Sequence, residues 1–466
     1  MTTCFGHICF ALCLPLLGSC TSLFYSGYAA NEYNAKVRVQ ADGKRVSVTP
    51  RSDKRAVDLW QILKDYPEAE VVLGGDIIVA DAPAKDLTVP VFRVDGKGYT
   101  VKLGLFPVLR KTDVNIRNVV FDCENATEKV LYAIGADKNK DFVVTNCVFK
   151  NPTEKNTLCA RKYGNVIIEN CTIEGTLKPK SIRNKNSTAQ ILIYECTGSV
   201  TVRNNYIHHC FGVAIDCIGF SANKDNRVLI ENNRIDMVSN GGIVFTGGDV
   251  WNATVRNNSI CNTHCLGKQF KGEPDGGPNS AINFHGFRNA VVEDNRITNC
   301  PNSVCFDFDG SITGGKKVEK GTGLVVRRNV CENVGGIALF VIKDVEFKDN
   351  VLSSPRDNKS SRYLAITGAS NVEISGNKFL LTSKSSSTFY PITLSDIGEV
   401  KSGNVKVVDN TMETNGKIFV FVNREFKGEC QIEENEIISP HATASVVNNS
   451  KAKVTIPKSK KIVWYK

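Results

Sequence analysis

The sequence predicts an all-β protein in which one long parallel solenoid of about twelve or more coils takes up most of the chain. The first observation is a six-residue segment that recurs as two short alternating apolar stretches around a central position. The second is that the residues between copies hold only short β-type runs, which leave no room for a periodic amphipathic helix. The central position is occupied in turn by Val119, Cys147, Cys171, Asn205, Asn233, Asn258, Asn295, Asn329, Asn350, Asn377, Asn410 and Asn435.

The spacing of the copies fits one coil per copy. Neighbouring central residues are separated by 21 residues at the closest (Asn329 to Asn350) and by 37 at the widest (Asn258 to Asn295). A repeat of this length with three short strands is typical of a parallel β-solenoid. The 466 residues are therefore expected to share one continuous core, although ordinary domain sizes would suggest two or three domains.

The recurring Asn predicts a ladder at one turn of the solenoid. A stacked Asn can bond its side-chain amide to the neighbouring coil and so satisfy backbone groups that a sharp bend leaves unpaired. Val119, Cys147 and Cys171 replace Asn in the early coils, so the ladder is expected to begin near residue 205. Two positions earlier the charge often alternates in sign, and we expect these side chains to form solvated ion pairs between coils. They are Glu169, Arg203, Glu231, Arg256, Glu293, Arg327 and Lys348.

The first 20 residues predict export. They contain no Lys, Arg, Asp or Glu, they are apolar, and they end in small residues, as a secretory signal peptide does. The end of this segment, residues 17–20, resembles a bacterial lipobox, in which Cys20 would be lipidated after cleavage. No apolar run of about 18 residues follows, so we expect no internal membrane span. The protein is therefore expected outside the cytoplasm, either lipid-anchored in the cell envelope or extracellular.

Composition narrows the class of partner. Hydrophobic residues make up 42% and charged residues 23% of the chain, which is a globular composition. Lys plus Arg exceed Asp plus Glu by 58 to 48, so the net charge of +10 favours an anionic partner. The positive charge is spread along the chain, and export would separate the protein from nucleic acid. An acidic polysaccharide is therefore the expected partner. We expect the protein to be a monomer. The leader contains four of the 17 Cys, and most of the others are expected to be small core hydrophobes.

These features resemble the right-handed parallel β-helix proteins of the pectin-lyase-like superfamily. The resemblance covers roughly residues 55–440 and concerns architecture; the family's catalytic signatures are absent. It divides the chain into a signal peptide (1–20), an N-terminal extension (21–54), the β-helix (55–440) and a C-terminal cap (441–466). Residues 55–66 have apolar side chains at helical spacing, and the resemblance implies that this short helix caps the open N-terminal end of the core.

The resemblance also implies that the outward face of the first strand of each coil lines the substrate cleft. Alignment within this sequence puts Asp216, Thr246, Phe284, Asp307 and Phe340 at one outward position, and Tyr194 extends the column. Aromatic side chains on such a face can stack on sugar rings, and carboxylates can bind sugar hydroxyls. The column therefore indicates a glycan-binding groove; the alternative is that long turns cover these aromatics as a satellite core.

Asp307 and Asp309 are the candidate catalytic pair. They lie two residues apart, so both should point out of the same strand with their Cα atoms about 7 Å apart. Paired carboxylates at such separations carry out glycoside hydrolysis, one as acid and one as base. Desolvation beside Phe284 and Phe340 would suit Asp307 as the acid, and Asp309, nearer the turn, suits the base. The alternatives are a solvated strand end or a cation site, and a structural or catalytic calcium would fit the latter.

Further substrate contacts are predicted around this pair. His285 should point inward at the end of its strand, near Arg288, as a structural residue or as a substrate contact at the rim. Lys316 and Lys317 lie in a Gly- and Lys-rich turn, which suits a uronate or sulfated glycan. His208 to Cys210 and the segment 261–265 look like metal ligands by composition. Because alignment places Cys210 in the core, we expect no zinc site.

Two functions remain open from the sequence. The first is an exported enzyme that acts on an acidic polysaccharide, as a glycoside hydrolase through Asp307 and Asp309 or as a lyase. A lyase would need a basic residue, and Arg288, Lys316, Lys317 and Lys343 are the candidates. The second is a non-catalytic glycan-binding, adhesive or structural protein of the cell surface. Fold analogy contributes most of the first reading.

Overall fold

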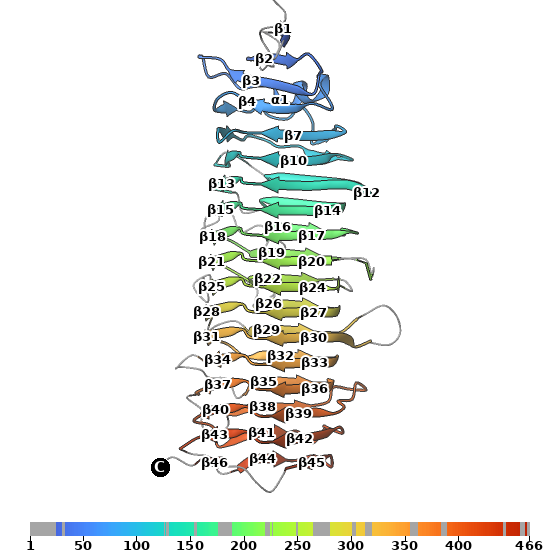
Figure 1. Ribbon diagram of the computed structural model, residues 1–466, viewed down its shortest axis with the longest axis vertical. Helices are drawn as coiled ribbons and strands as arrows, with labels where there is room; N and C mark the ends of the chain where they lie inside the picture. Colours follow the sequence, from blue (N-terminus) through green and yellow to red (C-terminus); the bar gives the residue numbers. More distant parts are fainter. Residues whose placement is uncertain are drawn as a thin grey trace, which may run out of the picture.

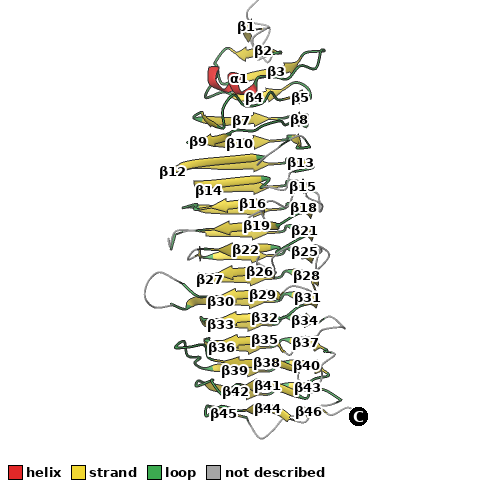
Figure 2. Cartoon of the chain, turned by 180° about the vertical axis from the view of Figure 1, so that it is seen from behind, coloured by secondary structure: helices red, strands yellow, loops and turns green. Residues whose placement is uncertain are grey.

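The computed structural model shows one parallel β-helix, as predicted (Figure 1). The structure describes residues 25–29, 33–124, 126, 130–152, 156–175, 189–219, 224–225, 227–247, 250–263, 280–300, 304–312, 319–354, 362–383, 389–440, 444–456 and 462–463. The coils stack along the long axis of the molecule, from β1 at one end to β46 at the other (Figures 1 and 2).

Each complete coil has a first strand, a bend, a second strand, an Asn turn and a third strand. The third strands form a 15-stranded sheet, and the first and second strands together belong to a 31-stranded sheet. The third strands are β5 (Ile77–Ile78), β8 (Thr100–Lys102), β11 (Val120–Asp122), β13 (Val148–Lys150), β15 (Thr172–Glu174), β18 (Tyr206–Cys210), β21 (Arg234–Val238), β25 (Ser259–Thr263), β28 (Arg296–Cys300), β31 (Val330–Val334), β34 (Val351–Ser353), β37 (Lys378–Leu381), β40 (Thr411–Thr414), β43 (Glu436–Ile438) and β46 (Ile462–Val463).

The first strands pair in parallel from coil to coil. They are β6 (Asp86–Thr88), β9 (Val108–Arg110), β16 (Ala189–Tyr194), β19 (Val213–Ile218), β22 (Ile243–Thr246), β26 (Ser280–His285), β29 (Val304–Asp309), β32 (Ile337–Phe340), β35 (Arg362–Thr367), β38 (Tyr390–Ser395), β41 (Ile418–Val422) and β44 (Ala444–Asn448). In two early coils the first and second strands run on without a break, as β12 (Leu131–Thr145) and β14 (Leu158–Glu169).

The second strands lead into the Asn turn. They are β4 (Glu70–Leu73), β7 (Val91–Asp95), β10 (Asp113–Arg117), β17 (Ser199–Arg203), β20 (Arg227–Glu231), β23 (Val250–Trp251), β24 (Ala253–Arg256), β27 (Phe287–Glu293), β30 (Gly321–Arg327), β33 (Ile342–Lys348), β36 (Ser370–Ser375), β39 (Val405–Val408), β42 (Glu429–Glu433) and β45 (Lys453–Thr455).

Side chains alternate between the inner and outer faces of each strand, and the inward ones fill the core. Inward positions carry Val, Ile, Leu and Phe, which form one continuous apolar cluster along the whole helix. Eleven of the cysteines that the structure describes are buried and unbridged, as expected for small core hydrophobes: Cys123, Cys147, Cys159, Cys171, Cys196, Cys210, Cys217, Cys300, Cys305, Cys331 and Cys430.

The predicted Asn ladder is confirmed and starts where expected. The side-chain Oδ1 of Asn205 accepts a bond of 2.9 Å from the backbone N–H of Cys171, which is the junction with the thiol-bearing coils. Further along, Asn295 Nδ2 donates to Asn329 Oδ1 at 3.0 Å and to the Val255 carbonyl at 2.9 Å. Each amide thus contacts the coils on both sides. The same pattern reaches Asn435, and the ladder side chains from Asn205 to Asn410 are almost fully buried.

The left-handed backbone at this turn lies one residue before the ladder. Asn232, Asn257 and Asp409 have φ of 55°, 54° and 53°, and the ladder asparagines themselves do not have positive φ. Asn and Asp tolerate this conformation better than other side chains with a Cβ.

The predicted column of ion pairs is also confirmed. Successive coils are joined by Glu169–Arg203 at 2.8 Å, Glu231–Arg256 at 2.7 Å and Glu293–Arg327 at 2.8 Å.

The N-terminal end of the core is covered by the predicted helix. Helix α1 (Leu59–Asp65) begins at Asp58, whose side chain accepts a bond from the backbone of Gln61. Trp60 and Leu63 are buried against the first coil, and Trp60 Nε1 donates to the Ala80 carbonyl at 2.7 Å. Strands β1 (Tyr25–Ala29), β2 (Ala35–Gln40) and β3 (Arg45–Pro50) pair antiparallel over this end, and β3 continues onto β4 in parallel.

At the other end, β44, β45 and β46 pair in parallel with the coil before them. Part of the segment that the sequence analysis assigns to a C-terminal cap is therefore a further coil. The signal segment, including Cys20, lies outside the described residues. Among the helices of the described chain, none has the length and apolar character needed to cross a membrane.

The ladder predicts a measurable stability effect. Asn295→Ala should leave the Asn258 backbone N–H and the Val255 carbonyl without partners in the core, which costs about 2–4 kcal/mol of unfolding free energy. Urea unfolding followed by circular dichroism measures this cost. The exposed Asn404 provides the control: Asn404→Ala should change the midpoint little, and equal effects of the two substitutions would contradict a structural ladder.

Candidate functional site

The first strands between β16 and β38 carry the predicted site on their outer face. The parallel register aligns Asp216 with Val244, and Asn283 with Asp307. It also aligns His285 with Asp309, and Asp309 with Phe340. Two outward columns therefore run along this face: the Asp307 column (Leu192, Asp216, Val244, Asn283, Asp307 and Ala338) and the Asp309 column (Tyr194, Ile218, Thr246, His285, Asp309 and Phe340).

The prediction that Phe284 lines this face is wrong. Its ring is fully buried and stacks on Phe245, with centroids 4.2 Å apart, inside the core. Alignment by sequence matched Ser280 with Ser303, whereas the structure pairs Ser280 with Val304. A shift of one residue reverses every side chain of a strand between the two faces. The same shift explains why His285, expected to point inward, is 43% exposed beside Asp309.

Asp307 lies in a partly desolvated environment. Asn283, which is fully buried, donates from Nδ2 to Asp307 Oδ2 at 3.1 Å. The Oδ1 atom of Asn283 has no hydrogen-bond partner among the described residues. Burial and the nearby Asp309 carboxylate raise the pKa of Asp307, against a smaller lowering by His285 and the Asn283 bond. The carboxyl therefore favours its protonated form more than an exposed aspartate does.

Asp309 is partly exposed and is held by the backbone that follows it. Its side chain is 24% exposed, and Oδ1 accepts a bond of 2.9 Å from the backbone N–H of Ser311. His285 Nδ1 lies 3.8 Å from its other oxygen. Phe340, half-buried, follows on the next coil and points outward as predicted, although it adjoins Asp309 and not Asp307.

Asp216 and Tyr194 also face outward, as predicted. Asp216 lies three coils from Asp307, about 14 Å away. Burial raises the pKa of Asp216 to about 7, and a bond of 3.4 Å from the Thr246 hydroxyl only partly opposes this. Tyr194 lies under the Arg161 guanidinium, which is 4.7 Å from the ring centroid.

Of the cationic residues predicted to contact the substrate, the structure describes Arg288 but not Lys316 or Lys317. Arg288 Nη2 binds Glu319 Oε2 at 3.1 Å, and the guanidinium lies 5.4 Å from the centroid of the Trp251 ring. Lys316 and Lys317 lie outside the described residues. Lys320 Nζ, in the same turn, donates to the Lys401 carbonyl at 2.7 Å and so ties this turn to a later one.

This face can in principle support acid–base chemistry. Burial raises the pKa of one carboxyl, Asp307, and a second, Asp309, is partly exposed and held by a backbone N–H. Two such carboxyls two residues apart are the groups that glycoside hydrolysis requires. Among the described residues, no three His, Cys, Asp or Glu side chains are grouped so as to hold a metal ion.

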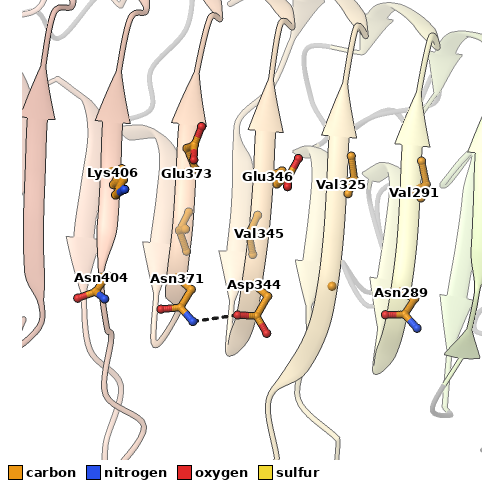
Figure 3. A pocket seen from close by; sticks show the side chains of 12 residues that line it. Asn289, Val291, Val325, Asp344, Val345, Glu346, Asn371, Glu373, Asn404 and Lys406 are labelled. Atoms are coloured by element: carbon orange, nitrogen blue, oxygen red, sulfur yellow. Dashed lines mark hydrogen bonds between the residues drawn. The ribbon is translucent and has the colours of Figure 1, made fainter.

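A second hollow lies on the same coils and was missed by the sequence analysis. It measures about 640 Å³ and covers the outer face of the second strands from β27 to β39. Figure 3 shows Val291 and Val325 on its floor and a file of polar side chains, Asn289, Asp344, Asn371 and Asn404, at the base of the strands. Asn371 Nδ2 donates to Asp344 Oδ1 at 2.9 Å. The signal was present as Asn or Asp at one place in four of five coils, with Gly323 in the fifth, but only the register shows that these residues align.

The buried carboxyl of Asp216 makes stability depend on pH. The folded chain keeps a proton that the unfolded chain releases near the ordinary pKa of 3.8, so stability falls as the pH rises from about 4 to about 7. Asp216→Asn removes this loss: the variant should match the wild type near pH 4 and exceed it by up to about 4 kcal/mol at pH 8. Thermal unfolding across this range measures the difference, and parallel pH curves for the two proteins would contradict it.

The family model for the right-handed β-helix region matches residues 110–260 and 191–379, which together exceed half of the chain. No curated protein matches the chain at a significant level. Three similar solved structures are a DFA-IIIase from Arthrobacter chlorophenolicus in complex with GF2, the AlgE4 A-module of mannuronan C-5 epimerase from Azotobacter vinelandii, and the catalytic unit of the GH87 α-1,3-glucanase from Streptomyces thermodiastaticus.

These three structures share little sequence with the chain. The DFA-IIIase is 11% identical, with 74% of this chain and 84% of that chain covered and a TM-score of 0.37. The epimerase module is 11% identical, with coverages of 85% and 93% and a TM-score of 0.38. The glucanase is 14% identical, with coverages of 81% and 68% and a TM-score of 0.38. From the match of the family model and the observed coils, the chain belongs to the proteins with a right-handed β-helix region.

Proposed function

We propose that this protein is a carbohydrate-active enzyme that hydrolyses a polysaccharide on the outer face of its first strands. The observation that carries the proposal is the pair Asp307 and Asp309 in two different environments on one strand. Burial raises the pKa of Asp307 and Asn283 holds its carboxyl, whereas Asp309 is accessible and receives a backbone N–H. Environments that separate two carboxyls in this way assign them to the acid and base roles.

The reaction follows from these roles. Asp307 gives its proton to the glycosidic oxygen as the bond from that oxygen to the anomeric carbon breaks. Asp309 accepts a proton from the water whose oxygen forms the new bond to that carbon, so one water is consumed and each product ends in a hydroxyl. Phe340 offers a ring face on which a sugar can stack beside the pair. The Tyr194 ring and the Asp216 carboxyl would bind the substrate further along the axis.

We further propose that the glycan is acidic and that the protein acts outside the cytoplasm. The net charge of +10 and the lysines of the turn around Lys316 and Lys317 favour an acidic polysaccharide. The Asp309 carboxylate opposes a uronate carboxylate placed directly beside it. The uncharged leader supports export, with Cys20 as the proposed lipid attachment site and an extracellular or envelope glycan as the substrate.

A second candidate is a non-catalytic surface protein that binds glycan. The hollow of Figure 3 favours it, because amide and carboxylate side chains repeat there on four of five coils, beside an outward row of two Val and three charged side chains. Coils lie about 4.8 Å apart, so an extended saccharide parallel to the axis would meet a polar side chain on four of the five coils. This surface could bind a chain without cleaving it.

Activity on a panel of glycans separates the two candidates. The purified protein is incubated with uronate-containing, sulfated and neutral polysaccharides, and reducing ends and unsaturated products are measured separately. We expect reducing ends without unsaturated products, and a loss of about 100-fold or more in Asp307→Asn. Asp409→Asn changes an exposed carboxylate on a distant coil and should retain activity.

Three outcomes would overturn parts of this proposal. No release from any glycan, with retained binding, would favour the non-catalytic protein. Unsaturated products would indicate a lyase and redirect the search to basic residues such as Arg288 and Lys343. Full activity in Asp307→Asn would remove the assignment of the acid.

A further inference from the structure

Two adjacent histidines on the third-strand sheet bring their ring nitrogens together. His208 and His209 lie on β18, and their Nδ1 atoms are 3.0 Å apart. Successive side chains of a strand normally point to opposite faces. Here His209 has a φ of 53°, so its backbone is left-handed and both rings lie on the accessible side of the sheet. The two rings are nearly perpendicular, at 85°, with centroids 5.2 Å apart.

The left-handed position itself is a regular feature of these coils. Met237, Asn262, Asn299 and Asn333 occupy corresponding places, with φ between 52° and 55°. In later coils the Asn side chains bond one another or a carboxylate: Asn333 Nδ2 donates to Asn299 Oδ1 at 3.1 Å, and Asn262 Nδ2 to Asp236 Oδ1 at 2.9 Å. The fold thus provides the conformation, and among the residues that the structure describes, this coil alone uses it to bring two imidazoles together.

The surroundings of the pair are polar and hold one ring in place. The His208 ring stacks on Tyr206, with centroids 4.2 Å apart, and the Arg234 guanidinium covers the same tyrosine at 4.7 Å. Glu174 on the preceding coil and Asp236 on the next align with His208 in the parallel register. The backbones of these two acidic residues therefore lie about 4.8 Å from that of His208 along the axis, on opposite sides.

From this geometry we propose that His208 and His209 chelate a divalent transition-metal ion through their two Nδ1 atoms. Metal–imidazole bonds of about 2.0–2.1 Å that meet at a right angle place two nitrogens about 2.9 Å apart, which matches the observed separation. The ion replaces the single proton that the two nitrogens otherwise share. Water molecules complete the coordination. Imidazole suits Cu²⁺, Ni²⁺ and Zn²⁺, and Cu²⁺ is expected to bind most tightly of the three.

The protonation state of the pair supports ligation. Burial lowers the pKa of His208, and His209 and Arg234 lower it further, against the opposite effect of Glu174 and Asp236. A lowered pKa leaves the ring neutral at neutral pH, as a metal ligand must be. The histidine pair lies on the sheet of third strands, whereas Asp307 and Asp309 lie on the other sheet. The metal site therefore does not depend on the proposed hydrolysis.

Copper binding to the full chain tests this inference. CuCl₂ is titrated into the wild type at neutral pH by calorimetry, and electron paramagnetic resonance reports the ligand nitrogens. We expect one tightly bound copper with hyperfine structure from two imidazole nitrogens, and a melting temperature that rises with copper. His209→Asn should weaken binding by about tenfold or more and lose the two-nitrogen signature.

The variants are chosen so that every outcome decides. Asn occupies the corresponding left-handed position in other coils, so His209→Asn should fold normally, and His208→Ala removes the other ligand as an independent check. His285→Asn makes the same change at a histidine on another sheet and should bind copper as the wild type does. Wild-type protein without stoichiometric copper, or a two-nitrogen signature that survives in both His208→Ala and His209→Asn, would overturn the proposal.

Discussion

The structure depends on hydrogen bonds that run between coils along the axis. A single coil buries little by itself, because its apolar face needs neighbours above and below. Parallel backbone bonds join the strands, but the sharp turn between the second and third strands leaves backbone groups that strand pairing does not reach. The Asn ladder supplies partners at this turn, and each amide binds the coil before it and the coil after it. The ladder thereby helps to set the register that brings distant residues such as Asn283 and Asp307 side by side.

This stacking explains how a chemically uneven face can arise on a regular scaffold. The inward positions are fixed by packing, whereas the outward positions of the first strands are free to vary from coil to coil. A carboxyl placed outward acquires its properties from its neighbours one coil away. Asp307 is desolvated and held by Asn283, Asp309 faces His285, and Asp216 lies beside the apolar Val244. The environment of each carboxyl is thus determined by residues roughly 24 to 28 positions away in the sequence.

The repeat allowed the architecture, the ladder and the ion-pair column to be predicted from the sequence, because each recurs at one position in many copies. The face of an individual strand was harder to predict. For β26 and β29, matching Ser280 with Ser303 gives an alignment that differs by one residue from the observed register. Packing decides between them: Phe284 stacks on Phe245 in the core, and this fixes Asn283 and His285 outward. The hollow on the second strands and the meeting of His208 with His209 lie at left-handed positions that recur from coil to coil, but only the structure shows which side chains these positions bring together.

The most direct test of the central claim is a crystal structure of Asp307→Asn with an oligosaccharide from a polysaccharide that the wild type cleaves. The account predicts a sugar stacked on Phe340, with a glycosidic oxygen within hydrogen-bond distance of the side chain at position 307 and Asp309 facing the anomeric carbon. An oligosaccharide bound only in the hollow of the second strands, or a side chain at position 307 out of reach of any sugar, would contradict it.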